Sequence, residues 1–121
     1  MKLVTRLFIL SGLFLNLSVS YADSPPSKTL SQVENKKVCM VNDMYFAKEQ
    51  IPVSVNDRTY YGCCENCKKT LKEDAQSRQA TDPITGKTVD KSTAVIGADT
   101  KGQVHYFENV ANLNSFNQRI K

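Results

Sequence analysis

The sequence predicts an α+β fold of two consecutive units, each a β-hairpin followed by a helix, around one small shared core. Two pairs of strand-like segments, at 51–62 and 93–107, are joined by turn-forming residues, and helically spaced apolar residues follow each pair. A shift of forty-five residues also places the two stretches in register. Because a single hairpin is only marginally stable in water, two hairpins with helical cover favour a common core.

The first 22 of the 121 residues have the pattern of a cleaved signal peptide. Lys2 and Arg6 precede an apolar run over 7–17, and small residues mark a cleavage site after Ala22. The run is shorter than the roughly 20 apolar residues of a membrane-spanning helix. We therefore expect a periplasmic or secreted protein with no membrane contact after cleavage; a retained N-terminal anchor is the alternative.

The mature chain is expected to begin with a flexible tether over 23–37, because prolines lie there among Ser, Lys and Gln. The cysteine-containing unit is then 38–81, and the cysteine-free unit is 82–121. The net charge of +4 falls when Lys2 and Arg6 are removed, leaving fourteen Lys and Arg against twelve Asp and Glu. So weak and scattered a charge argues against nucleic acid as a partner.

In the first unit, residues 39–43 predict a tight loop, and the alternation over 51–55 predicts a strand. Residues 56–58 predict a turn and 59–62 the returning strand. A helix is expected over 63–78, because apolar residues recur there every three or four positions. Those positions are Cys64, Cys67, Leu71 and Ala75.

In the second unit, residues 82–87 predict a loop, 93–96 a strand, 99–102 a turn and 103–107 the returning strand. Asn109 is a candidate N-cap for the last helix. The positions expected to be buried in that helix are Leu113, Phe116 and Ile120. Under the forty-five-residue shift, apolar positions of the first unit fall on apolar positions of the second, but the cysteines fall on other residue types. The matched pairs are Tyr61 with Tyr106, Leu71 with Phe116, Cys63 with Glu108, and Cys67 with Asn112.

Three of the four cysteines predict a metal site. Cys63 and Cys67 are four residues apart at the start of the predicted helix, so their side chains share one face. Cys39 precedes the hairpin whose returning strand ends at Cys63, and closing the hairpin brings the three sulfurs together. A helix N-terminus favours thiolate, and thiolates select soft or borderline metals, here Cu(I) or Zn(II).

Other residues are weaker candidates for ligands. Cys64 points about 100° away from its neighbours on the helix, which favours a buried packing role over a spare ligand or redox partner. Met40 offers a thioether to Cu(I), although methionine beside a small core more often packs. His105, the single histidine, is a candidate fourth ligand on a strand that need not face the site.

The order loop, hairpin, helix start resembles a treble-clef zinc finger. Cys39, then Cys63 and Cys67 after a Tyr-rich strand at 60–62, is similar to the TRASH family and, more broadly, the YHS family. The gap between the first two cysteines is slightly longer than usual there, and Cys64 is extra. The resemblance implies a treble-clef-like fold and a role in trafficking, resistance or sensing of heavy metals, with a metal-transport or resistance protein as partner.

The resemblance extends into the second unit, where residues 82–86 and later 105–107 are similar to the YHS pattern. Thr85 stands where that family has a cysteine. The resemblance therefore implies a cysteine-free YHS-like unit packed on the cysteine-containing one.

Two other uses of the cysteines remain open. Structural disulfides or a purely structural zinc would make the chain an interaction module, since exported domains of this size often need such a brace. Cys64 and Cys67 also form a Cys-x-x-Cys pair, but the thioredoxin-like redox fold needs parallel crossovers that this pattern lacks. Neither a catalytic triad nor a phosphate-binding glycine loop is evident, so the sequence does not predict an enzyme.

Overall fold

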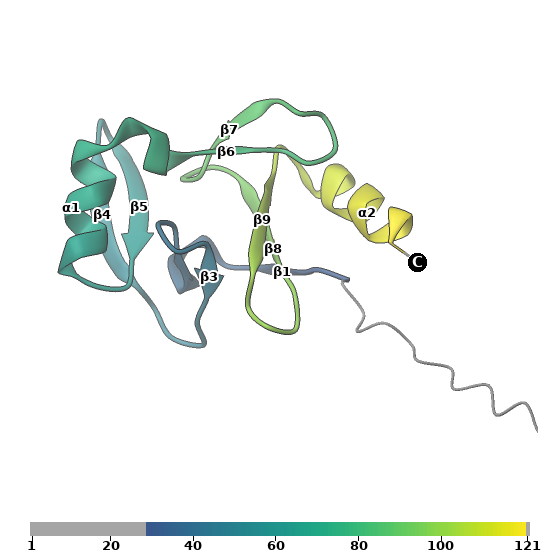
Figure 1. Cartoon of the computed structure of the whole chain (residues 1–121), viewed down its shortest axis with the longest axis horizontal. Coiled ribbons are helices and arrows are strands. Elements are labelled where there is room, and N and C mark those ends of the chain that lie inside the picture. Colours follow the sequence, from purple (N-terminus) through teal and green to yellow (C-terminus); the bar gives the residue numbers. More distant parts are fainter. Residues whose placement is uncertain (1–28, 121) are drawn as a thin grey trace, which may run out of the picture.

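The computed structural model describes residues 29–120, and the expected signal peptide at 1–22 lies outside them. The protein is a small mixed α+β structure with two helices and four small antiparallel sheets within the described residues. One helix lies at each end of the molecule, with strands between them (Figure 1). None of the helices at 29–120 is long and apolar enough to cross a bilayer.

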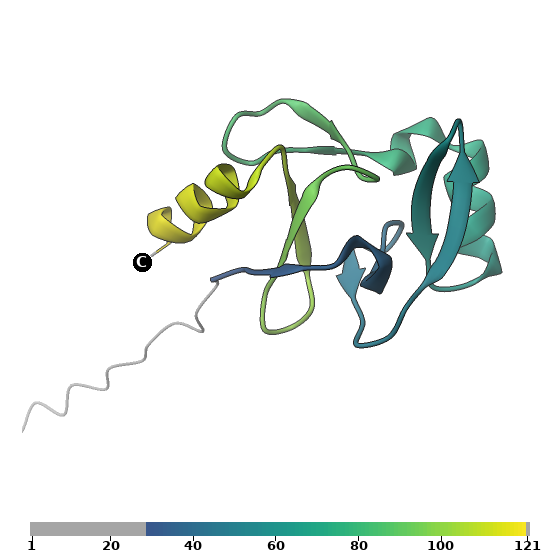
Figure 2. The same cartoon turned by 180° about the vertical axis from the view of Figure 1, so that it is seen from behind.

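The first half begins with a short pair of strands, β2 (Val38–Cys39) and β3 (Met44–Tyr45). The hairpin of β4 (Ile51–Val55) and β5 (Arg58–Gly62) follows, and α1 (Glu65–Glu73) packs against both of its strands. Seen from behind, α1 lies beyond the paired arrows of this hairpin (Figure 2). The predicted order of hairpin and helix is confirmed here.

Local chemistry fixes the ends of these elements. Asn56 and Asp57 both have positive φ angles, of 49° and 63°, as a two-residue hairpin turn requires. The helix predicted over 63–78 is shorter in the structure. It ends at Glu73. The next residue, Asp74, accepts a hydrogen bond on its side chain from the backbone N–H of Gln76 and so starts a separate 3₁₀ turn, η2 (Ala75–Arg78).

The second half starts with the pair β6 (Gln79–Thr81) and β7 (Thr88–Asp90), which frames the expected loop at 82–87. The hairpin of β8 (Val95–Ala98) and β9 (Val104–Phe107) and the helix α2 (Val110–Arg119) follow. Here too the helix contacts both strands of the hairpin. β6 and β7 cross above the space between the two hairpins (Figure 1).

Asn109 is the N-cap predicted for α2, since its side chain accepts a hydrogen bond from the Asn112 backbone N–H at 2.8 Å. Leu113 is buried as expected, and Phe116 is half-buried. The prediction for Ile120 is wrong, because α2 ends before it and its side chain is 37% exposed.

Part of the predicted tether is folded. β1 (Ser31–Val33) pairs antiparallel with β8, and η1 (Asn35–Lys37) follows it. Leu30 is buried, and the Asn117 side chain of α2 bonds both the N–H and the C=O of Leu30. The expectation of a tether therefore fails over 30–37, because contacts with the distant C-terminal hairpin and helix order a segment whose own composition is polar.

Both halves contribute to one hydrophobic core. Val53, Tyr60 and Leu71 of the first half pack in the same buried cluster as residues of β8 and β9. A second cluster, centred on the fully buried Phe107, packs beneath α2. The shared core expected from the sequence is therefore present. In this core, the segment around Cys39 packs against the hairpin of β8 and β9.

Candidate metal centre

The sulfurs of Cys39, Cys63 and Cys67 lie within 4.8 Å of one another. The Sγ atom of Cys67 is 3.8 Å from that of Cys39 and 3.6 Å from that of Cys63. Sulfurs bound to one tetrahedral metal at about 2.3 Å lie about 3.8 Å apart. The observed spacing is therefore compatible with a metal held by all three.

Three different elements bring these sulfurs together. Cys39 ends β2, Cys63 follows β5 directly, and Cys67 lies in the first turn of α1. The backbone N–H of Met40 bonds the Tyr61 carbonyl at 2.9 Å, which ties the β2 end to β5. Gly62 permits the close approach of the helix, since a Cβ at this position would lie 2.9 Å from the Cβ of Cys67.

The cluster has a buried side and an exposed side. Cys39 and Cys67 are buried, at 0% and 6% exposure, whereas Cys63 is exposed and accepts a hydrogen bond from the Asn42 side chain at 3.5 Å. The cluster is therefore open to solvent on the side of Cys63. None of the four cysteines forms a disulfide in the structure.

The surroundings tune the thiols in opposite directions. Burial works to raise the pKa of Cys39, but hydrogen bonds from the backbone N–H groups of Asn42 and Val41 outweigh it and lower that pKa. Burial and the three neighbouring sulfurs raise the pKa of Cys67 to about 12. A metal that binds the Cys67 thiolate must therefore displace a proton from it at neutral pH.

The loop that carries Cys39 is held by the second half of the chain. The ammonium of the buried Lys91 donates to the Met40 carbonyl at 2.6 Å and to the Asp43 carboxylate at 2.9 Å. The Tyr106 hydroxyl donates to the same carboxylate oxygen at 2.8 Å. These contacts hold the loop to β9 and to the turn after β7.

Replacing Lys91 should loosen this loop. Lys91→Met keeps the length of the side chain but leaves the Met40 carbonyl without its donor. We expect a loss of about 1–3 kcal/mol in the free energy of unfolding, measured by chemical denaturation. The exposed Lys101→Met is the matched control and should change stability little. Equal stability of the two variants would contradict the assigned role.

The weaker ligand candidates are distributed around this cluster. Cys64, the N-cap residue of α1, is exposed, and its Sγ atom lies 3.4 Å from that of Cys67. It is therefore not the buried packing residue that the sequence favoured. Met40 is fully buried in the main core, as a packing residue would be. His105 lies outside the three-cysteine group and packs on Phe116, with ring centroids 5.4 Å apart.

In the second half, a hydrogen-bond network joins the loop after β6 to the start of α2. Asp82 is fully buried, and its carboxylate accepts from the Glu108 backbone N–H and the Asn112 side chain, both at 2.8 Å. The Thr85 hydroxyl bonds the Glu108 carboxylate at 3.2 Å. Glu108 and Asn112 are the residues that the forty-five-residue shift matches to Cys63 and Cys67. In the sequence, Asp82 shows only the turn signal of an aspartate before Pro, which does not distinguish it as a buried hydrogen-bond acceptor.

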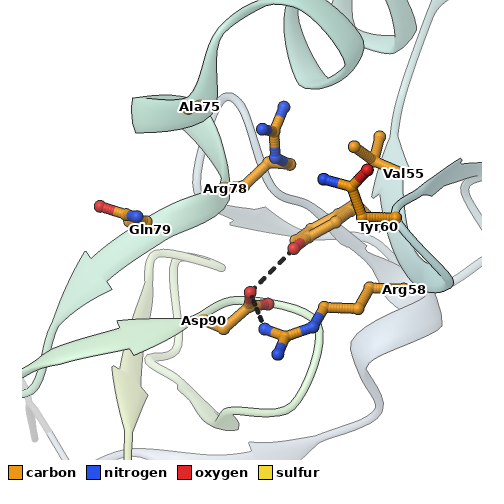
Figure 3. A pocket seen from close by; sticks show the side chains of 8 residues that line it. Val55, Arg58, Tyr60, Ala75, Arg78, Gln79 and Asp90 are labelled. Atoms are coloured by element: carbon orange, nitrogen blue, oxygen red, sulfur yellow. Dashed lines mark hydrogen bonds and ion pairs between the residues drawn. The ribbon is translucent and has the colours of Figure 1, made fainter.

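A hollow with no cysteine in its lining lies between β5, η2 and β7 (Figure 3). The Asp90 carboxylate there accepts from the Tyr60 hydroxyl at 2.9 Å and pairs with the Arg58 guanidinium. The Arg78 guanidinium lies 6.0 Å from the centre of the Tyr60 ring. These side chains satisfy one another and join the first hairpin to β7, so we assign them a structural role.

Comparison with known proteins adds no further assignment. No protein-family model, curated protein or solved structure matches the chain.

Proposed function

We propose that this chain is an exported protein that binds a soft metal ion, Cu(I) or Zn(II), through Cys39, Cys63 and Cys67. The observation that carries the proposal is the convergence of three sulfurs from separate elements within 4.8 Å. Thiolate sulfur is the donor that Cu(I) and Zn(II) accept and that Mg²⁺ and Ca²⁺ avoid. No carboxylate belongs to this group, so its donors favour a soft or borderline metal.

The number of ligands bears on the choice between the two metals. Three sulfurs complete the trigonal shell that suits Cu(I), whereas tetrahedral Zn(II) needs a fourth donor. Water reaching the exposed side beside Cys63 can supply that donor. Cu(I) therefore fits the three-cysteine set alone, and Zn(II) fits it with one exchangeable position.

A carrier, buffer or sensor-accessory role fits the site better than a purely structural one. The Cys39 loop is already braced by Lys91, Tyr106 and the backbone of β5. The ligand on the solvent side, Cys63, is exposed. A metal is thus not needed to shape the loop, and it can leave without dismantling the core. The rival proposal is an interaction module braced by a structural zinc or a disulfide.

The resemblance to the TRASH and YHS families supports the same proposal. It rests on the spacing of the cysteines and on the repeat of hairpin and helix. In this proposal the two halves are tandem treble-clef-like units, of which the first binds metal. A metal-transport or resistance protein is the partner that such a role implies, and the N-terminal pattern of the sequence supports export. No catalytic role is proposed.

A titration followed by metal removal tests the proposal. The reduced chain should bind one equivalent of Cu(I) or Zn(II) in competition with a coloured chelator. Excess chelator should then remove the metal while circular dichroism and the denaturation midpoint show a folded protein. Absence of stoichiometric binding would refute the metal site. Unfolding on removal of the metal would favour the structural alternative, because structural zinc contributes on the order of 10 kcal/mol to folding.

A further inference from the structure

We propose that Cys64 and Cys67 form a dithiol–disulfide pair whose oxidation withdraws Cys67 from the metal and releases the ion. The inference rests on the proposed metal site and adds a means of regulating it. It assigns a role to the one cysteine that the three-ligand group leaves over.

The geometry of the helix start carries the proposal. The Cys64–Cys67 distance of 3.4 Å is the shortest of the three distances from Cys67 to the other sulfurs. A disulfide bond is about 2.05 Å long, so the two atoms must approach by about 1.4 Å. Cys64 is the N-cap residue with extended backbone, φ −155° and ψ 173°, and is thus not held by helical geometry. Rotation of its exposed side chain can supply this approach.

Cys64 is more open to attack by an oxidant in solution than Cys39 or Cys63. Cys39 has no exposed surface, so an oxidant in solution cannot reach it directly. Cys63 is exposed, but its sulfur is a proposed ligand and accepts the Asn42 hydrogen bond. Cys64 is exposed and outside the ligand group, and therefore stays free to react while the metal is bound.

The chemistry is a two-electron thiol–disulfide exchange with an external disulfide as oxidant. The Cys64 sulfur attacks one sulfur of that disulfide, its S–S bond breaks, and one thiol leaves with a proton. The Cys67 thiolate, leaving the metal, then attacks the Cys64 sulfur, forming the Cys64–Cys67 bond and expelling the second sulfur as a thiolate that takes a proton from water. The two cysteines are oxidised and the external disulfide is reduced to two thiols.

Loss of Cys67 removes the central ligand. The sulfurs of Cys39 and Cys63 remain, one buried and one exposed, and two sulfurs do not complete a trigonal or tetrahedral shell. The ion leaves with its oxidation state unchanged. The pair thus makes retention of the metal depend on the thiol–disulfide balance of the compartment.

Oxidised glutathione is the probe for this proposal. The metal-loaded chain is mixed with it under anaerobic conditions in the presence of a coloured chelator, and metal release is followed over time. Fragmentation mass spectrometry of the digested protein then assigns the disulfide. We expect release to accompany a Cys64–Cys67 bond, and Cys64→Ser to retain the metal and slow the oxidant-dependent release roughly tenfold or more.

Equal release rates for the wild type and Cys64→Ser would overturn the inference, as would a bond from Cys67 to Cys63 or Cys39. A loaded wild type that keeps its metal despite oxidation would also overturn it. Failure of the metal site itself is distinguishable, since the reduced chain would then bind no metal at the start. The disulfide assignment on metal-free protein still tests the pair in that case.

Discussion

Cys67→Ser is expected to lower the affinity for Cu(I) or Zn(II) by about 100-fold or more, because serine replaces a soft donor with a hydroxyl that these metals bind poorly. Cys67 is the central residue of the cluster, with its sulfur within 3.8 Å of each of the other three. A competition titration against a chelator of known affinity measures the loss.

The chain provides its own matched control. Cys64→Ser alters an adjacent sulfur at the same helix start but leaves the three-ligand group intact. It should bind the metal with nearly unchanged affinity when reduced. Cys39→Ser and Cys63→Ser should each weaken binding, since each removes one of three ligands. If all four variants behaved alike, the three-cysteine assignment would be wrong.

Folding must be checked independently, because Cys67 is buried beside Gly62. Cys67→Ala removes the ligand without placing a hydroxyl in that position. If both Cys67 variants keep the circular dichroism spectrum and denaturation midpoint of the metal-free wild type, the loss of affinity is caused by removal of the Cys67 sulfur and not by unfolding. A loss of affinity seen only together with unfolding would count against a specific ligand role.

Periodic apolar residues and turn chemistry made the two hairpin–helix segments predictable. Asn56 and Asp57 signal their turn, and Asn109 signals its cap, through local backbone preferences. The convergence of Cys39, Cys63 and Cys67 was predictable for a related reason, since a hairpin and a helix start have fixed geometry. Local rules sufficed for the order of these hairpins and helices, for the Asn56–Asp57 turn and for the Asn109 cap.

Features that depend on distant contacts were not predictable in this way. The strand β1 forms because it finds β8 more than sixty residues later, and nothing in its own sequence signals that pairing. Lys91 reads as one of many surface lysines, yet it is buried against the Cys39 loop. The exposure of Cys64 was missed because helical spacing was extended to the N-cap, whose backbone is not helical.

The two halves join their loops to their helix starts with different chemistry. In the first half, sulfurs connect a loop, a strand end and a helix start. In the second half, the Asp82 carboxylate connects the loop after β6 to the start of α2, through hydrogen bonds from the Glu108 backbone N–H and the Asn112 side chain. Hydrogen bonds to Asp82 therefore hold the second half together without a metal. This is the physical reason for expecting the domain to stay folded after a metal is removed.

Asp82→Ala should then be strongly destabilising, by about 3–5 kcal/mol, because it leaves several donors without an acceptor. Besides Glu108 and Asn112, the Ile84 backbone N–H donates to this carboxylate at 2.7 Å. A small domain has a total stability of only about 5–15 kcal/mol, so this single change should remove much of it. Chemical denaturation measures the loss, and the exposed Glu73→Ala serves as control.

The dependence on pH gives this prediction a second readout. Burial works to raise the pKa of Asp82, but the hydrogen bonds from Glu108, Asn112 and Ile84 outweigh it and hold that pKa below its usual value. A lowered folded-state pKa means that the carboxylate stabilises the fold above its unfolded pKa of about 3.9. That contribution is lost as the pH falls below this value toward the folded pKa.

Asp82→Asn should accordingly be less stable than the wild type near neutral pH and should lose less stability on acidification. The pH dependence should shrink without disappearing, because hydrogen bonds from Ser92, Tyr60 and Arg58 also outweigh burial and lower the pKa of Asp90. Denaturation curves recorded from pH 7 down to pH 3 measure both effects. Parallel pH profiles for Asp82→Asn and the wild type would show that the carboxylate does not fasten the second half.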